Sequence, residues 1–346
     1  MKRFIGALLV LLLGSVLFIG VTRISGVLAP REFSVSAAAP TPAEGHDLEH
    51  EVGEGGGTLT SAILTDPVQI DPQALPNPGM DALLPYLFDT LVVWDANARI
   101  APSLARSWQI SPDGRSITME LKPEVYFQDG NLLNAQAVQA TFQRFRAVGT
   151  HSPLYKSILQ IRQIAVIDDR TVRFDIDGSA ADWLKVLASP YAGIISPESA
   201  ALMEQAHTNL VVGSGPFMVG VWDPGQSITL QRYVGYHWGP SINQNRDAVL
   251  IQNVVFQVIP DPAAQVKALK QGRLAAIYVA QPEQWLELQA DPALQVIAAP
   301  NLKAQDASYP SLYIRSQGLA LAPGIQQTKI AATGQMLLND TTIAGQ

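Results

Sequence analysis

The stretch VVFQVIPDPAAQVKALKQGRLAAIYV (254–279) carries the clearest structural signals in the chain. An apolar run of strand length, 254–259, is followed by Asp261-Pro262, a helix cap and a proline suited to the first helical turn. Apolar residues then recur on one helical face, Gly272 is placed to end the helix, and a second strand spans 274–279. This pattern predicts a β-α-β unit with parallel strands and a right-handed crossover, and therefore an α/β fold class.

Helix and strand signals continue on both sides of this unit. A helix over 282–290 and a strand over 294–298 follow it, and Thr58 to Leu64 is predicted as the first strand of a globular body. Asp81 is predicted to cap an early helix, in which Pro85 must lie in the first turn or produce a kink.

Cap and turn residues organise the middle of the chain. Pro112-Asp113-Gly114 predicts a turn between two strands, and Asn134 predicts the start of a helix whose apolar residues share one face. Two strands are expected on either side of Asp168-Asp169-Arg170, and Ser196-Pro197-Glu198 supplies a helix cap followed by a first-turn proline.

Composition limits the classes of function. The chain has 346 residues, 47% of them hydrophobic, which is enough for two or three domains and excludes disorder throughout. A net charge of -7 leaves no basic face for phosphate groups, so nucleic acid is not expected as a partner. The absence of cysteine excludes disulfides, thiolate metal sites and cysteine nucleophiles.

The N-terminal segment predicts export. Lys2 and Arg3 precede an uncharged apolar run from Phe4 to Val21, which is typical of a signal peptide and also near the lower limit for a membrane-spanning helix. Residues 1–28 are therefore predicted as a signal peptide or a membrane anchor, and 29–57 as a flexible linker rich in Ala, Pro, Glu and Gly. The globular body is expected in the periplasm or on the extracytoplasmic face of the cell membrane.

No constellation of catalytic residues is visible. His151, His207 and His237 are scattered, no serine motif is present, and His46 with His50 is best explained as part of a solvated linker. We therefore predict a protein that is not an enzyme, with no catalytic residues, no metal ligands and no cofactor.

Several motifs, in order, resemble one known family. They are Asp71-Pro72, the stretch Ile100 to Trp108 (similar to "P-x-L-A-x-S-W"), Ser111-Pro112-Asp113-Gly114 with the following segment to Gly130, Gly213 to Phe217 (similar to "G-T-G-P-F"), and Tyr236-His237-Trp238 before the β-α-β unit. Together they cover about residues 58 to 300. On these motifs the chain is identified as a member of the family 5 solute-binding proteins of peptide, dipeptide and nickel ABC transporters.

The resemblance implies a periplasmic-binding-protein-like fold of type II, in its large three-domain variety. It assigns 58–80 and 196–300 to an N-terminal lobe and 81–195 to an inserted domain. Residues 301–346 would begin a truncated second lobe, so the far lobe is expected to be mostly missing. In this segment Ser311 to Ser316 resembles the crossover strand, and Ile325 to Ile343 resembles the first helix of that lobe.

The resemblance also implies three groups of solute contacts. They follow the Asp-Pro turn, the Ser-Pro of the inserted domain and the second strand of the β-α-β unit, where a tyrosine and backbone amides would line a peptide groove by strand-like hydrogen bonding. The corresponding residues are Pro76, Asn77, Pro78, Leu154, Tyr155, Tyr278, Val279 and Ala280.

The expected function is that of the extracytoplasmic solute-binding component of an ABC importer. Its expected partners are a small solute, above all a peptide, the permease subunits, and a second chain if one supplies the missing lobe. Two alternatives remain at this stage: an exported hydrolase whose carboxylates converge only in the folded state, and a truncated or split relative that no longer binds solute.

Overall fold

The chain divides into two units, residues 1–36 and 37–346, and every residue that the structure describes lies in the second. This computed structural model describes residues 56–279, 282–298, 318–330 and 336–344. The predicted signal or anchor segment, nearly all of the linker and the predicted strand at 311–316 therefore lie outside the described residues. Among the described helices, none combines the length and the apolar character that a bilayer crossing requires.

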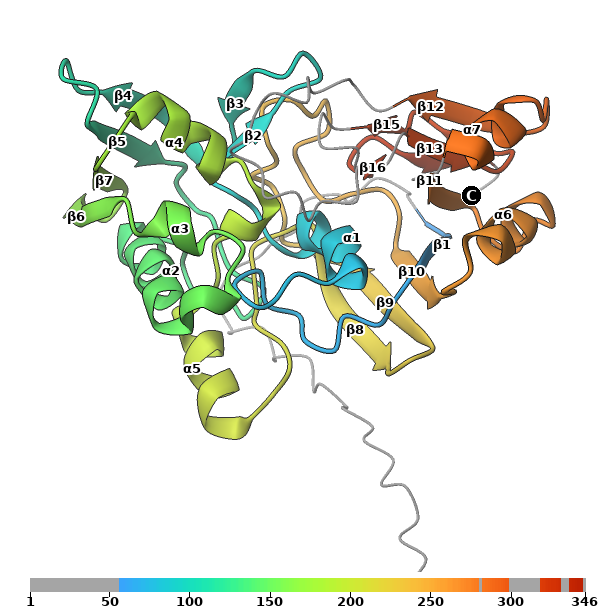
Figure 1. The fold of residues 1–346 in the computed structure, drawn as a ribbon, viewed down its shortest axis with the longest axis horizontal. Helices are drawn as coiled ribbons and strands as arrows, with labels where there is room; N and C mark the ends of the chain where they lie inside the picture. The colour runs from blue at the N-terminus through green and yellow to red at the C-terminus, as the bar shows by residue number, and fades with distance from the viewer. Residues whose placement is uncertain (1–55, 280–281, 299–317, 331–335, 345–346) are drawn as a thin grey trace, which may run out of the picture. The chain divides into compact units, whose positions relative to one another are not determined.

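The first predicted strand lies at the edge of a four-stranded sheet with the order β1-β10-β9-β8. β1 pairs in parallel with β10, placing Thr58 opposite Asn253, and the other neighbours are antiparallel. Leu59 and Phe256 are fully buried, because alternate side chains of each strand face the core. The strands are β1 (Thr58–Ile63), β8 (Phe217–Asp223), β9 (Ser227–Arg232) and β10 (Asn253–Val258) (Figure 1).

Helix α1 (Pro78–Leu87) begins before the predicted cap. The Asn77 side chain accepts hydrogen bonds from the backbone N–H of Gly79 at 2.7 Å and of Met80 at 3.4 Å, and Pro78 takes the first helical position. A proline at that position has no N–H to satisfy, which favours a start at this point.

The prediction that Asp81 caps this helix was therefore wrong. Asp81 lies in the first turn of α1, is buried, and accepts a hydrogen bond from the Tyr191 hydroxyl. Pro85 lies inside the helix. Asn77, four positions earlier, is the cap instead, and this role was not predicted from the sequence.

A second sheet, with the order β4-β5-β7-β6, is antiparallel throughout. The turn predicted at 112–114 joins β4 to β5, with Gly114 at a φ of 68°, and the predicted pair of strands around 168–170 forms β6 and β7. The strands of this part are β4 (Ala105–Ile110), β5 (Ser116–Leu121), β6 (Ile161–Asp168) and β7 (Thr171–Ile176), with a separate pair of β2 (Val92–Trp94) and β3 (Ile100–Pro102).

Helix α2 packs against β6 and β7 (Figure 1). Asn134 caps it as predicted, by accepting a hydrogen bond from the backbone N–H of Ala137 at 2.9 Å. The Phe142 ring meets Phe174 of β7 edge to face, with ring centroids 5.1 Å apart, and also packs on Trp183. The helical elements here are α2 (Ala135–Val148), η1 (Gly149–His151), α3 (Tyr155–Ile158), α4 (Ala180–Leu187) and η2 (Pro190–Ala192).

Helix α5 (Pro197–Ala206) and the turn that follows it also agree with the sequence. Ser196 accepts a hydrogen bond from the N–H of Ser199 as its cap. The Gly213–Phe217 turn then passes directly over the end of α1: a Cβ on Gly215 would lie 2.5 Å from the backbone of Leu87. Glycine is required there because the two backbones touch.

The predicted β-α-β unit is correct in its elements but not in its pairing. β10, α6 (Pro262–Lys270) and β11 (Ala276–Val279) occur in the predicted order, and Gly272 has a φ of 70° just after the helix. However, β10 and β11 lie in different sheets, so they do not share the parallel sheet that the β-α-β pattern predicts. β1 pairs with β10, and the residue before β11 contacts β1 through the hydrogen bond from Ala275 N–H to Thr60 O at 2.8 Å.

β11 instead belongs to an antiparallel sheet with the order β11-β13-β12, beside which α6 and α7 lie (Figure 1). The predicted helix at 282–290 and strand at 294–298 are confirmed as α7 (Pro282–Gln289) and β12 (Gln295–Ala298), while β13 spans Gly318–Leu321.

The helix expected over Ile325 to Ile343 is wrong for the residues described there. They form two short antiparallel pairs, β14 (Ile325–Gln326) with β17 (Thr342–Ile343) and β15 (Lys329–Ile330) with β16 (Met336–Leu337). Met336 and Leu338 are each 1% exposed, and Lys329 forms an ion pair with Asp340 at 2.9 Å. Burial and this ion pair favour the extended form here over the helix that the family resemblance implied.

Candidate functional site

Tyr278 lies in the most distinctive environment among the predicted contacts. Its hydroxyl oxygen is 2.7 Å from that of Tyr86 in α1, and Tyr86 in turn donates to the backbone carbonyl of Met336 in β16 at 3.1 Å. The three residues come from α1, β11 and β16, so one small polar cluster joins three separate parts of the chain.

The ring of Tyr86 is held by aromatic neighbours. It meets Phe217 edge to face at 6.1 Å and Phe256 at 5.8 Å between centroids, and the side chain is 3% exposed. Burial raises the pKa of Tyr86 well above its ordinary value, so the hydroxyl keeps its proton at any physiological pH. Tyr86 was not among the residues predicted from the sequence.

The predicted contacts at 76–78 form the entrance to α1. The side-chain oxygen of Asn77 caps the helix and also accepts a hydrogen bond from the Thr65 hydroxyl. Its side-chain nitrogen donates to Asp66 O at 3.1 Å. Pro76 is partly exposed and Pro78 exposed. The position of Asn77 is therefore fixed by its role as a cap.

The loop before these residues is anchored to α2. Arg144 donates to Asp71 Oδ2 and to Gln73 Oε1, both at 2.9 Å, and Gln73 donates to Thr141 O at 2.9 Å. Because Asp71 and Gln73 are buried, this network fixes the Asp-Pro turn from which residues 76–78 emerge.

The remaining predicted contacts have other surroundings. Leu154 is buried, and its N–H donates to the Ser152 hydroxyl at 3.2 Å, whereas Tyr155 is partly exposed at the start of α3. Val279 is fully buried at the end of β11, and Ala280 lies outside the described residues.

A buried carboxylate that the sequence analysis missed lies near the end of α1. Asp89 accepts hydrogen bonds from Trp238 Nε1 at 3.0 Å, from the Ser214 hydroxyl at 3.1 Å and from the Tyr236 hydroxyl at 3.2 Å. Burial raises its pKa to about 6, against the effect of these donors and of the nearby Lys122. A single carboxylate in the apolar run 83–93 was the available signal, since an isolated buried charge requires partners.

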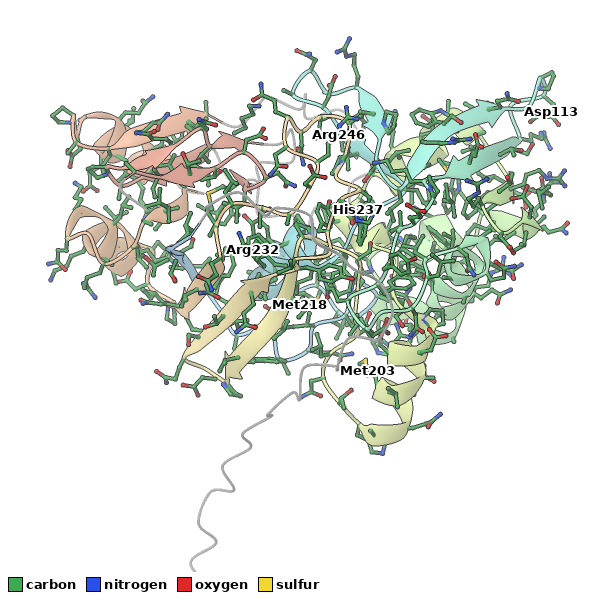
Figure 2. The ribbon with its side chains drawn as sticks, turned by 180° about the vertical axis from the view of Figure 1, so that it is seen from behind. Asp113, Met203, Met218, Arg232, His237 and Arg246 are labelled. Carbon is green, nitrogen blue, oxygen red and sulfur yellow. The ribbon has the colours of Figure 1, made fainter. Side chains whose placement is uncertain are left out.

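Lys122 connects this cluster to β5. Its ammonium donates to the carbonyl oxygens of Trp238 at 2.8 Å and Gly239 at 2.9 Å, and burial lowers its pKa to about 8. His237, labelled in Figure 2, packs edge to face on Trp238 with ring centroids 4.9 Å apart. The resemblance motifs Gly213 to Phe217 and Tyr236 to Trp238 therefore meet around Asp89 and act in packing.

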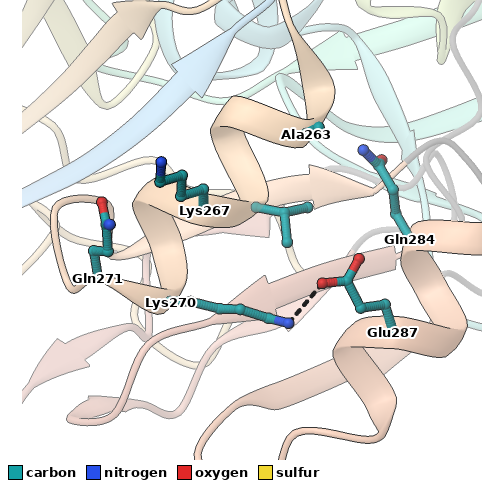
Figure 3. A pocket seen from close by; sticks show the side chains of 7 residues that line it. Ala263, Lys267, Lys270, Gln271, Gln284 and Glu287 are labelled. Carbon is teal, nitrogen blue, oxygen red and sulfur yellow. Dashed lines mark hydrogen bonds and ion pairs between the residues drawn. The ribbon is translucent and has the colours of Figure 1, made fainter.

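A surface cavity of about 450 Å³ lies between α6 and α7 (Figure 3). Lys270 and Glu287 form an ion pair across it at 2.6 Å, and Val266, Lys267 and Gln284 also line it. The predicted solute contacts are not among its described lining residues. No group of three or more His, Asp or Glu residues suited to a metal occurs in the described part of the chain.

Comparisons with known proteins agree with this architecture. The family described as "Bacterial extracellular solute-binding proteins, family 5 Middle" matches residues 99–319. The glutathione-binding protein GsiB of Escherichia coli K12 is 23% identical over 233 residues, which cover 67% of this chain and 44% of GsiB. GsiB of Pectobacterium atrosepticum is 26% identical over 235 residues, covering 64% of this chain and 44% of the relative.

Solved structures show the same fold. The periplasmic binding protein DppA of Helicobacter pylori, in complex with the peptide STSA, has a TM-score of 0.61 and 27% identity, over 71% of this chain and 51% of DppA. NikA of Brucella suis, in complex with Fe(III)-EDTA, has a TM-score of 0.60 and 22% identity, over 70% of this chain and 48% of NikA.

The predicted α/β fold of the periplasmic-binding-protein type is thus confirmed, and the chain spans about half the length of the proteins that it matches. The match over 99–319 includes the second sheet, the partners of Asp89 at 214, 236 and 238, and the β10-α6-β11 segment. The chain belongs to the bacterial extracellular solute-binding proteins of family 5.

Proposed function

We propose that this chain is the solute-binding component of an ABC importer, and that it binds peptides or similar small solutes outside the cytoplasm for delivery to the permease subunits. The observation that carries the proposal is membership of the family through residues 99–319. A binding protein of this kind works by recognition alone and needs no catalytic group.

Peptide-like solutes are the class that the chemistry favours. GsiB is named as a glutathione-binding protein, and DppA was solved with the peptide STSA. In this chain, the partly buried Tyr278 combines an aromatic ring with a hydroxyl group, a combination suited to peptide main-chain groups. Residues 76–78, Leu154 with Tyr155, and 278–280 remain the proposed contacts.

We further propose export, with residues 1–28 as the signal peptide or anchor and Lys2 and Arg3 left on the cytoplasmic side. A reporter enzyme that is active only outside the cytoplasm, fused after Gln346, is expected to be active. Activity of only a cytoplasm-dependent reporter at the same fusion point would contradict this orientation.

The function is tested by measuring the melting temperature of the purified full chain with separate pools of short peptides, nickel complexes and sugars. A ligand that binds only the native state stabilises it by about 2.7 kcal/mol at a concentration of 100 times Kd. A shift with the peptide pool, followed by saturable heat in isothermal titration, is the expected result. Equal melting temperatures in all pools would contradict the proposal.

A further inference from the structure

Charge is segregated between two neighbouring helices, α6 and α7. The chain has no acidic residue from 262 to 282, a range that contains α6 and three basic residues. It has no basic residue from 283 to 302, a range that contains all of α7 after its first residue and three acidic residues. The basic residues are Lys267, Lys270 and Arg273, and the acidic residues are Glu283, Glu287 and Asp291. Because the two helices contact each other, a basic surface lies next to an acidic one.

The charged residues are exposed on both helices, and each set follows one helical face. Residues three, four or seven positions apart share a face of an α-helix. On α6 the exposed residues with this spacing are Ala263, Lys267 and Lys270, and on α7 they are Glu283, Leu286 and Glu287. We call these six residues the helix-pair surface. Lys270 and Glu287 reach towards each other from opposite walls of the groove between the helices (Figure 3).

Within one chain, the opposite charges of the helix-pair surface are only partly paired. Lys270 Nζ lies 2.6 Å from Glu287 Oε1 across the groove. In the described part of the chain, Lys267 and Glu283 form no ion pair. The groove has a volume of about 450 Å³, and the buried Val266 is among the residues that line it. A basic set, an acidic set and an open groove therefore remain available to a partner.

We propose that the helix-pair surface is the interface of a homodimer in which the two-fold axis runs along the groove. A half-turn about that axis places α6 of each copy over α7 of the other, so each basic set meets an acidic set. A two-fold axis across the groove would instead place α6 over α6 and α7 over α7, and like charges opposed in this way weaken association. The charge pattern therefore selects a second copy of this chain as the partner and also selects its orientation.

Leu286 supplies the apolar part of this interface. Its side chain is 68% exposed in the single chain. In the dimer it lies against α6 of the other copy, where the aliphatic stems of Lys267 and Lys270 cover apolar surface while their ammonium groups reach the carboxylates. The symmetry makes this contact twice, so two leucine side chains leave water. The charges set the pairing, and the burial of leucine strengthens it.

Sedimentation equilibrium of the purified full chain tests the proposal, in one mild detergent throughout because residues 4–21 are apolar. We expect the mass of two chains. The dissociation constant should rise severalfold between about 50 and about 500 mM NaCl, because salt screens exposed ion pairs. Association through the apolar segment 4–21 would not weaken with salt, so a salt-independent dimer would count against the proposed interface.

Charge reversal identifies the surface. Lys267→Glu with Lys270→Glu makes the helix-pair surface wholly acidic, so two copies repel and the dissociation constant should rise about tenfold or more. Glu283→Lys with Glu287→Lys makes the surface wholly basic and should have the same effect. All four substitutions in one chain exchange the two signs and restore a complementary pattern, so this chain should dimerise within about threefold of the unaltered one.

The matched control is Arg115→Glu with Lys156→Glu, which makes the same change in net charge at two exposed residues outside α6 and α7. It should dimerise as the unaltered chain does. A monomeric unaltered chain would overturn the proposal, and so would equal association of the control and the wholly acidic variant. Failure of the four substitutions together to restore the dimer would overturn the two-fold arrangement. The dimer goes beyond the proposed function, and its test needs no solute, so none of these results bears on solute binding.

Discussion

The indole Nε1 of Trp238 donates a hydrogen bond to the carboxylate of Asp89 at 3.0 Å, although the two residues are 149 positions apart in the chain. The same indole also donates to the Ser214 carbonyl at 3.0 Å. This contact joins the end of α1 to two of the motifs that mark the family. Because Asp89 is buried and has a raised pKa, the contact also makes stability depend on pH.

The free energy of unfolding, measured at different pH values, should show the titration of Asp89. Its pKa is about 6 in the folded chain and about 3.8 when exposed, so the folded state binds the proton more tightly. The stabilisation is complete below the lower pKa and is lost as the pH rises through about 6. Between about pH 5 and about pH 7 this group should lower the free energy of unfolding by about 1 kcal/mol.

Urea titrations of Asp89→Asn should lack this part of the pH dependence, whereas the exposed control Asp223→Asn should keep it. Lys122 does not interfere, because its pKa of about 8 leaves it charged throughout that range. Equal slopes in the unaltered chain and in Asp89→Asn would show that Asp89 does not titrate there.

Replacing Gly215 by alanine should destabilise the fold by about 2 kcal/mol or more, since the new Cβ would lie 2.5 Å from the Leu87 backbone and α1 would have to move. Thermal unfolding measures this effect. Gly56→Ala is the control, because a Cβ there meets nothing within 4 Å. A melting temperature equal to that of the control would mean that α1 and the turn are not in contact.

Gly272→Val tests the end of α6. A φ of 70° is strained for any residue with a Cβ, and no atom lies within 4 Å of the added carbon, so the cost is purely conformational. We expect a loss of about 1 kcal/mol or more in the free energy of unfolding, with a smaller loss in Gly272→Asn because asparagine tolerates this conformation better. Identical stability of both variants and the unaltered chain would contradict the observed helix end.

Asn77→Ala separates the two roles considered for that residue. Loss of the cap on α1 should cost about 1 kcal/mol of stability, and Asn77→Asp should restore most of it because a carboxylate also accepts from the first-turn N–H groups. If Asn77 also contacts solute, peptide affinity should fall further in Asn77→Ala than stability explains. Circular dichroism melts, read beside peptide titrations, make the comparison.

The sequence alone determined the features that depend on neighbouring residues. Asn134 and Ser196 cap the predicted helices, Gly272 ends α6, and the turn at 112–114 joins two strands, because each acts on backbone groups within a few positions. The motif order was also sufficient to identify the family, since motifs are read along the chain.

Tertiary structure decided the features that require distant partners. β10 pairs with β1 and not with β11. Tyr86 forms hydrogen bonds with Tyr278 and Met336, which are 192 and 250 positions away in the chain. The family resemblance implied a helix over 325–343, yet its described residues pair as strands, with Met336 buried and Lys329 ion-paired with Asp340. Local propensity is worth tenths of a kcal/mol per residue, whereas a fully buried apolar side chain contributes about 1.5–3 kcal/mol. The contacts between distant residues therefore settled the pairing of the strands and the surroundings of the candidate site.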